Sequence, residues 1–212
     1  MTSMASETET EPKPGTRTRL LDVAETMFAA NGFASTSVRE ITDAAGTNLG
    51  AINYHFQSKE NLYAEVFRRR IARVHEQFLA ALRDSEAATG GDLDGTLSAL
   101  ARAFMSPHTE PENSRRFLDL CTREMIEARL PAGLFLREFV TPLIEMIMSP
   151  IRRARSDLDE NATRGCAHSF LAQLLHIVKG ARAAAGTDIA IAPVGEQLAH
   201  VVRFTAAAVR HI

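Results

Sequence analysis

Apolar residues recur at three- and four-residue intervals along almost the whole chain. In the first such segment Leu20, Ala24 and Phe28 share one face, and the pair Asn31-Gly32 follows as a helix stop. No segment shows the alternation and hairpin turns of strands. The pattern predicts an all-α protein of about nine helices. The expected helices span about 17–31, 37–45, 48–55, 59–83, 93–105, 114–129, 133–149, 160–185 and 194–211, with breaks at 106–111 and 150–159.

The order of these helices predicts two helical units. Residues 1–15 are rich in Thr, Glu and Pro, so we expect a disordered tail. Three short helices in residues 16–62 predict a small N-terminal domain, and residues 63–212 a larger helical domain for ligand binding and dimerisation. The 59–83 helix would span about 37 Å, a length that suits a connector between two bodies.

Composition excludes several protein classes. Apolar residues make up 45% and charged residues 24%, as in ordinary globular proteins. The net charge of −2 rules out a bulk attraction to nucleic acid, so any such binding needs a local patch. Cys121 and Cys166 form no CxxC pair, which argues against a disulfide scaffold or a cysteine zinc site. The polar start has no apolar signal region, and no stretch is apolar enough to span a bilayer, so we expect a cytoplasmic protein with no membrane partner.

The segment from Ser37 to Phe56 carries the clearest functional signal. Two short helices meet at Gly46, where the chain has to reverse within a few residues. Val38, Ile41 and Ala45 form the inward face of the first helix, and Leu49 and Ile52 are the apolar positions of the second. This is the build of a helix-turn-helix, which presents its second helix to the DNA major groove. The alternative from these residues alone is an αα-corner within any helical protein.

Residues 17–67 resemble the DNA-binding domain of the TetR family of bacterial transcription regulators. The resemblance implies a homodimer on palindromic double-stranded DNA, usually a repressor released by a small-molecule ligand. We expect no enzymatic activity, cofactor or metal site, because the sequence contains no GxSxG, P-loop, GxGxxG or HExxH motif and no Cys-His cluster. The matching segments are residues 20–25 (LLDVAE), 28–33 (FAANGF), 36–41 (TSVREI), 44–46 (AAG) and 54–62 (YHFQSKENL).

The resemblance also implies which residues contact DNA. Thr42, Thr47 and Asn53 depart from the family pattern, and an Asn in place of an aromatic changes which bases can be read, because Asn pairs bidentately with adenine. The family's base-reading positions fall on Arg39, Leu49, Gly50, Ala51 and Asn53, and its phosphate contacts on Thr36, Ser37, Asn48, Tyr54, His55 and Lys59.

The C-terminal half gives less specific signals. Residues 123–125, 139–143 and 170–173 resemble the CerR-type subgroup of the same family. The simplest interpretation of the aromatic and Met residues in this half is that they form the hydrophobic core. A ligand-responsive regulator, however, needs a cavity within such a core. The residues expected to line that cavity are Phe104, Phe117, Cys121, Met125, Phe135, Phe139 and Phe170.

The last two helices carry apolar stripes at alternating spacings of four and three residues. One reading is burial within the monomer. The other is a four-helix dimer interface to which each subunit gives two helices. The predicted interface residues are Phe170, Leu174, Ile177, Ala181, Val194, Leu198, Val201, Thr205 and Ala208.

Other chemistry finds little support. His168 and His176 could share a helix face, but no further ligands with metal-site spacing accompany them. Cys121 lies close to Arg123, which leaves a redox sensor as an alternative to a buried apolar role. The leading hypothesis is a dimeric, ligand-responsive repressor. The rivals are a regulator gated by a protein partner or not gated at all, and a helical enzyme or carrier that merely contains a helix-turn-helix.

Overall fold

The computed structural model describes residues 15–109, 113–184 and 187–212. Within these ranges the chain forms nine α-helices and one π-helical segment without any β-strand, which confirms the all-α prediction. The predicted disordered tail lies outside the described residues except for Gly15. The elements are α1 (Thr16–Asn31), α2 (Val38–Ala44), α3 (Gly50–His55), α4 (Lys59–Thr89), α5 (Leu93–Thr109), α6 (Asn113–Glu127), η1 (Phe135–Val140), α7 (Thr141–Ala154), α8 (Glu160–Ala184) and α9 (Val194–His211).

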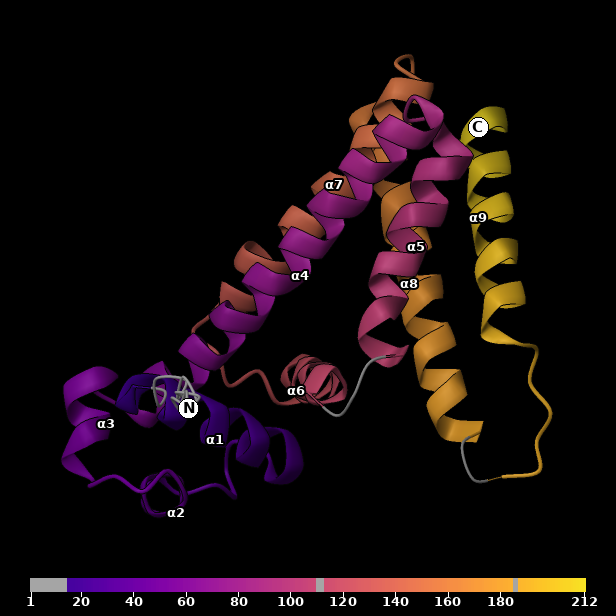
Figure 1. Ribbon diagram of the computed structural model, residues 1–212. Coiled ribbons are helices and arrows are strands. Elements are labelled where there is room, and N and C mark those ends of the chain that lie inside the picture. Colours follow the sequence, from indigo (N-terminus) through magenta and orange to yellow (C-terminus); the bar gives the residue numbers. More distant parts are fainter. Residues whose placement is uncertain (1–14, 110–112, 185–186) are drawn as a thin grey trace, which may run out of the picture.

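Helices α1, α2 and α3 gather with the start of α4 at one end of the molecule (Figure 1). Helices α2 and α3 are too short to be stable alone and depend on this packing. Their core also includes Phe67 of α4 and Leu120 of α6, so it continues past residue 62. The most deeply buried side chains from the first four helices include Leu20, Phe28, Ile41, Ile52 and Leu62.

A second core lies among α5, α7, α8, α9 and the far part of α4. Its largest fully buried side chains include Phe78 of α4, Leu97 of α5 and Phe170 of α8. Helix α4 reaches from the N-terminal helices to the far end of this bundle (Figure 1). Val74 of α4 packs against both cores, so α4 joins them mechanically as the sequence predicted.

Several helix boundaries differ from the sequence prediction. The single helix predicted at 133–149 is instead the π-helical segment η1 followed by α7. Helix α4 continues to Thr89, where Gly90 adopts a left-handed conformation with φ 64°. The break predicted at 150–159 begins later, at Arg155, because α7 runs through the buried Pro150 to Ala154. Proline removes one backbone hydrogen bond from a helix, and burial of its ring offsets part of that cost. The break predicted at 106–111 begins later, since α5 continues to Thr109; residues 110–112 lie outside the described residues.

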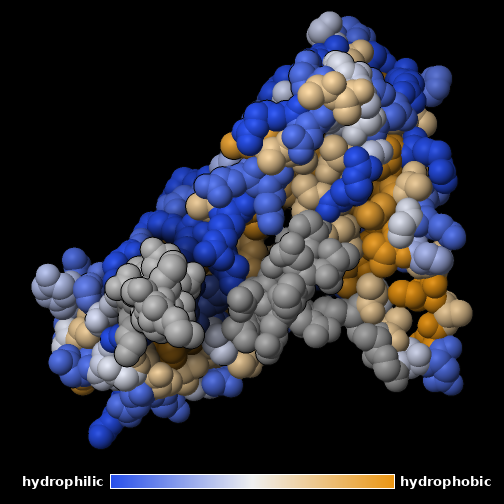
Figure 2. Space-filling model, in the orientation of Figure 1, coloured by the Kyte–Doolittle hydropathy of each residue, from blue (hydrophilic) through white to orange (hydrophobic). Residues whose placement is uncertain are grey.

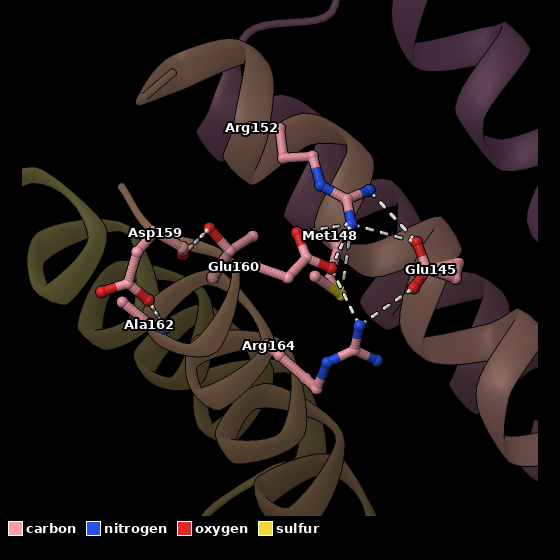
Figure 3. A network of polar contacts seen from close by, with 8 residues as sticks. Glu145, Met148, Arg152, Asp159, Glu160, Ala162 and Arg164 are labelled. Carbon is pink, nitrogen blue, oxygen red and sulfur yellow. Dashed lines mark hydrogen bonds and ion pairs between the residues drawn. The ribbon is translucent and has the colours of Figure 1, made fainter. Parts of the chain in front are cut away.

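Arginine side chains connect α7, α8 and the end of α9 through ion pairs and hydrogen bonds. Figure 3 shows the guanidinium groups of Arg152 and Arg164 directed at the carboxylates of Glu145 and Glu160, which join α7 to α8. These side chains are partly exposed to water, so each ion pair contributes little to stability. Arg155 donates to the carbonyl oxygens of Val209, Arg210 and Ile212 at 2.9–3.0 Å. A cation there satisfies the free carbonyls that end α9 and complements its dipole.

A buried charge cluster joins α1 to α4. Glu25 of α1 is 2% exposed and accepts hydrogen bonds from Arg69 Nη2 at 2.8 Å and from Arg70 Nε at 2.6 Å. Arg69 also contacts Asp22 at 2.7 Å. Glu25 and Arg70 lie largely out of water, so the loss of either would leave the other charge buried and unpaired, and this pair therefore fixes the position of α1 against α4.

Candidate nucleic-acid interface and ligand cavity

Side-chain caps and one glycine form the helix-turn-helix. Ser37 accepts a hydrogen bond from the backbone N–H of Glu40, and the Glu40 carboxylate accepts one from the N–H of Ser37, which is a capping box. Gly46 adopts φ 62° where the chain turns towards α3. The hydroxyl of Thr42 donates to the carbonyl of Arg39 at 2.9 Å, so this departure from the family pattern leaves no unsatisfied group in the core.

The short helix α3 turns one face to solvent and anchors the other. Ile52 is buried, whereas the side chains of Leu49, Asn53 and Tyr54 are exposed and Gly50 has none. Asn48 precedes the helix, and its Oδ1 accepts the backbone N–H of Ala51 at 3.1 Å. Such a face of short or absent side chains allows the helix backbone to approach the edges of bases.

The predicted DNA-contacting residues fall into two groups. Ser37, Arg39, Asn48, Leu49, Gly50, Asn53 and Tyr54 are exposed, and Ala51, His55 and Lys59 are half-buried, so all of these can reach a partner. Thr36 cannot, which corrects the prediction. It is 1% exposed, and its hydroxyl lies 2.9 Å from the Gly32 carbonyl and 3.2 Å from that of Met27. Thr36 therefore holds the end of α1 instead of offering a hydroxyl to phosphate.

Lys59 lies at the border between the N-terminal core and solvent. Its Nζ lies 4.2 Å from the centroid of the Phe33 ring, a cation–π contact. Partial burial lowers the pKa of this ammonium, and the charges of Glu60 and Glu40 oppose that shift. Tyr54 is 84% exposed and packs edge-on against His55, with 4.8 Å between ring centroids. Their contacts with phosphate stay predictions.

A cavity of about 830 Å³ lies among α5, α6, η1, α7 and α8, and it is mostly apolar. Residues 128–133 between α6 and η1 form part of the wall, which sequence periodicity could not indicate. The π-helical turn widens the backbone at Leu136 and Val140, and such turns are frequent at functional sites. Of the predicted lining residues, Phe104, Cys121, Met125, Phe135 and Phe139 line it.

Two residues predicted for the cavity lie elsewhere, which corrects the prediction. Phe117 packs edge-on against Phe67 and Phe139, with ring centroids 6.0 Å and 5.4 Å apart, and belongs to the N-terminal core. Phe170 is fully buried in the second core. The helical spacing of apolar residues in the sequence predicted that both side chains are buried. This spacing cannot distinguish a side chain packed within the core from one that lines a cavity.

The cavity also has polar and sulfur-containing walls. Glu124 is buried, and its carboxylate accepts the backbone N–H groups of Leu130 at 2.9 Å and Arg129 at 3.1 Å. Burial, and secondarily the charge of Glu124, raises the pKa of the Cys121 thiol well above its usual value. Reactive cysteines need the opposite shift, so the redox-sensor alternative loses support.

Helix α6 belongs to both the cavity and the N-terminal unit. It places Cys121, Glu124 and Met125 on the cavity wall. From the same helix, Arg123 Nη2 donates to the carbonyl oxygen of Ala30, near the end of α1, at 3.1 Å. A displacement of α6 at the cavity therefore acts directly on α1.

The predicted interface stripe on α8 and α9 is mostly internal. Phe170 and Leu174 are fully buried in the chain's own core and offer no surface to a partner, which corrects the list at these two positions. Ile177, Val201 and Thr205 are also buried, but Ile177 and Val201 line a groove between α8 and α9, and Thr205 lines a hollow beside Phe204. Ala181, Val194, Leu198 and Ala208 are half-buried. The spacing of apolar residues identified the apolar face of each helix. It could not show whether that face is covered by a neighbouring helix of the same chain.

A different face of α8 and α9 is open. It contains a groove of about 790 Å³ between the two helices, lined in part by Ala172, His176, Ala199 and His200. Farther along, Phe204 is 58% exposed beside Gly165 and Ser169. Figure 2 shows apolar residues gathered over the side of the molecule formed by α5, α8 and α9, in contrast to the more hydrophilic end at α1–α4.

Two other kinds of site are absent from the described residues. No group of three or more His, Cys, Asp or Glu side chains in this part of the chain is placed to hold a metal ion. Of the helices in the described ranges, none is both long and apolar enough to cross a membrane.

Comparison with known sequences identifies relatives that match part of the chain. Residues 20–66 match the model of the bacterial regulatory proteins of the tetR family. The HTH-type transcriptional repressor KstR2 of Rhodococcus jostii is 39% identical over 92 residues, which cover 43% of each chain. KstR2 of Mycolicibacterium smegmatis is 32% identical over 130 residues, covering 59% of this chain and 62% of the relative. The chain thus matches about half the length of these curated relatives.

Comparison with solved structures extends the likeness to the whole fold. The structure of SmeT, the repressor of the Stenotrophomonas maltophilia multidrug efflux pump SmeDEF, superposes with a TM-score of 0.65 at 23% identity, covering 92% of this chain and 90% of that one. The CerR-type subgroup stays a prediction. These matches show that residues 20–66 are similar to the DNA-binding region of the tetR family of bacterial regulatory proteins and that the fold as a whole is like that of SmeT.

Proposed function

We propose that the protein is a homodimeric transcriptional repressor that binds a palindromic DNA operator and is released from it by an apolar ligand. The observation that carries the proposal is the exposed face of α3, where Leu49, Gly50 and Asn53 are presented by a helix anchored through Ile52. Two curated relatives that match part of the chain are transcriptional repressors. Such a regulator acts where the chromosome is, in the cytoplasm.

Local placement of charge supports DNA binding despite the net charge of −2. Arg39 is exposed beside α3, and Lys59 lies at the start of α4, on the border of the same unit. Phosphate contacts from such cations set affinity and register, whereas base edges set the sequence preference.

A dimer follows from the geometry that DNA requires. Two recognition helices must enter major grooves one turn apart, at about 34–36 Å. The open face of α8 and α9, with the groove beside His176 and His200 and with the exposed Phe204, is our proposed contact between subunits. Small residues such as Gly165 and Ala172 would let the helices of two subunits approach closely.

Ligand control has a direct mechanical route. A ligand in the 830 Å³ cavity contacts α6, and Arg123 of α6 holds the end of α1 through the Ala30 carbonyl. If the ligand favours one arrangement of α6, the position of α1 and of the recognition helices shifts with it. By linkage, a ligand that weakens operator binding tenfold must itself bind tenfold more weakly to the operator complex, a coupling of about 1.4 kcal/mol.

A mobility-shift titration on the DNA upstream of the protein's own gene tests the proposal. We expect binding at low protein concentration to this DNA and far weaker binding to a scrambled duplex of the same composition. Equal affinity for both duplexes would overturn the function. Repeating the titration with a metabolite panel tests ligand control, since a complex that no small molecule weakens would favour gating by a protein partner or no gating.

A further inference from the structure

The leading end of α3 presents an unusual pair of side chains. Leu49 directly precedes the helix and is 56% exposed, although Ile52 and Phe56 nearby are buried. Asn53 lies four residues farther along and is also exposed. Residues four apart share one side of a helix, so the aliphatic side chain and the amide face the same partner.

The amide of Asn53 is free to pair. The Oδ1 of Asn48 accepts a hydrogen bond from the backbone N–H of Ala51, and this bond fixes the start of the helix. Within the described part of the chain, the Asn53 side chain makes no hydrogen bond or ion pair, so both its donor and its acceptor remain available. Gly50 lies between the two positions and adds no side chain that would hold the helix away from a base.

These two side chains match two groups in the major groove. The Asn amide has one donor and one acceptor that fit N7 and N6 of adenine, whereas guanine offers two acceptors there. Leucine has no hydrogen-bonding group, and the C5-methyl of thymine is the apolar group on a base edge. Four residues of helix rise about 6 Å, close to two base-pair steps of 3.4 Å.

We propose that Asn53 reads an adenine and Leu49 contacts a thymine methyl about two base pairs away, so each operator half-site needs A·T pairs at both positions. This inference rests on the proposed function and adds to it the bases that are read. A G·C pair at either position loses the matching contact and is rejected.

The methyl contact can be tested by changing one group on the DNA. After in vitro selection of a preferred duplex by the full-length protein, each thymine is replaced in turn by uracil, which removes only the methyl. At one thymine per half-site we expect a loss of roughly fourfold, and of roughly 15-fold when both half-sites are changed. In Leu49→Ala, uracil at that position should cost nothing further.

Matched variants separate the contact from folding and from DNA shape. Leu79 is an exposed leucine of α4, and Leu79→Ala should keep the full sensitivity to uracil. For the amide, replacing the adenine by 7-deazaadenine removes N7 and should weaken binding roughly fivefold per half-site, but not in Asn53→Ala. Circular dichroism melting confirms that each variant is folded.

The outcomes distinguish this inference from the function beneath it. A protein that selects no preferred duplex would refute the proposed function. A protein that selects one, yet tolerates uracil at every thymine or loses the same affinity to uracil in the wild type and in Leu49→Ala, would overturn the leucine contact and leave the function standing. Selected half-sites with G·C pairs at both positions would overturn the inference as a whole.

Discussion

The buried charge cluster between α1 and α4 allows a prediction with a defined magnitude. Glu25 is 2% exposed and contacts both Arg69 and Arg70, and Arg70 is itself buried. Glu25→Gln keeps the volume but removes the charge that the Arg70 guanidinium faces. Removing one partner of a buried pair leaves the other charge out of water and costs about 3–5 kcal/mol. For a chain of this length that lowers the melting temperature by roughly 10 °C.

The same cluster supplies the control. Asp22 also contacts Arg69, but its side chain is 57% exposed, so Asp22→Asn should cost about 1 kcal/mol or less. Urea unfolding followed by circular dichroism measures both values, provided that the slope with denaturant is unchanged. A Glu25→Gln variant no less stable than Asp22→Asn would refute the view that buried charge fixes α1 to α4.

The remaining predictions concern the DNA contact, the subunit contact and the ligand cavity. Lys59→Ala should weaken binding similarly on all DNA and lower the salt slope by about one unit per bound subunit, and an unchanged slope would argue against a phosphate contact. Phe204→Arg, on the open face, should give folded monomers in sedimentation experiments, and these monomers should bind the operator poorly. Leu174→Arg, in contrast, places a charge in the core and should unfold the protein. A Phe204→Arg variant that stays dimeric would reject this interface. Leu175→Trp fills part of the cavity and should keep operator affinity while making it insensitive to any metabolite that releases the wild type; continued release would argue against the cavity as the ligand site.

Local signals in the sequence predicted the helix-turn-helix well. The end of α1 at Asn31 and the turn at Gly46 depend on glycines with positive φ, and both were indicated by the sequence. The capping box of Ser37 and Glu40, which was not predicted from the sequence, also involves residues only three positions apart. Such features act over a few residues, so sequence alone can indicate them. Thr36 shows the limit, because the same short hydroxyl that suits a phosphate also suits the carbonyl at the end of a helix.

Features that depend on tertiary packing were not predictable in the same way. The stripe through Phe170 and Leu174 is apolar whether it faces a second subunit or its own chain, and only the fold decides that it is internal. Pro150 indicates a helix break by its own chemistry, yet packing keeps it within α7. The cavity wall at residues 128–133 shows no hydrophobic periodicity in the sequence. This connection is held in place by hydrogen bonds to Glu124 and by the surrounding helices, which the sequence pattern does not reveal.

Footprinting of the protein on its operator tests the central claim most directly. The account predicts two equivalent protected half-sites, related by a two-fold axis and centred one helical turn apart, about 34–36 Å along the DNA. Each half-site should lose its protection in Asn53→Ala at the base pair that this side chain reads. A single asymmetric protected region, or uniform protection without half-sites, would contradict a dimer that places one α3 helix in each of two major grooves.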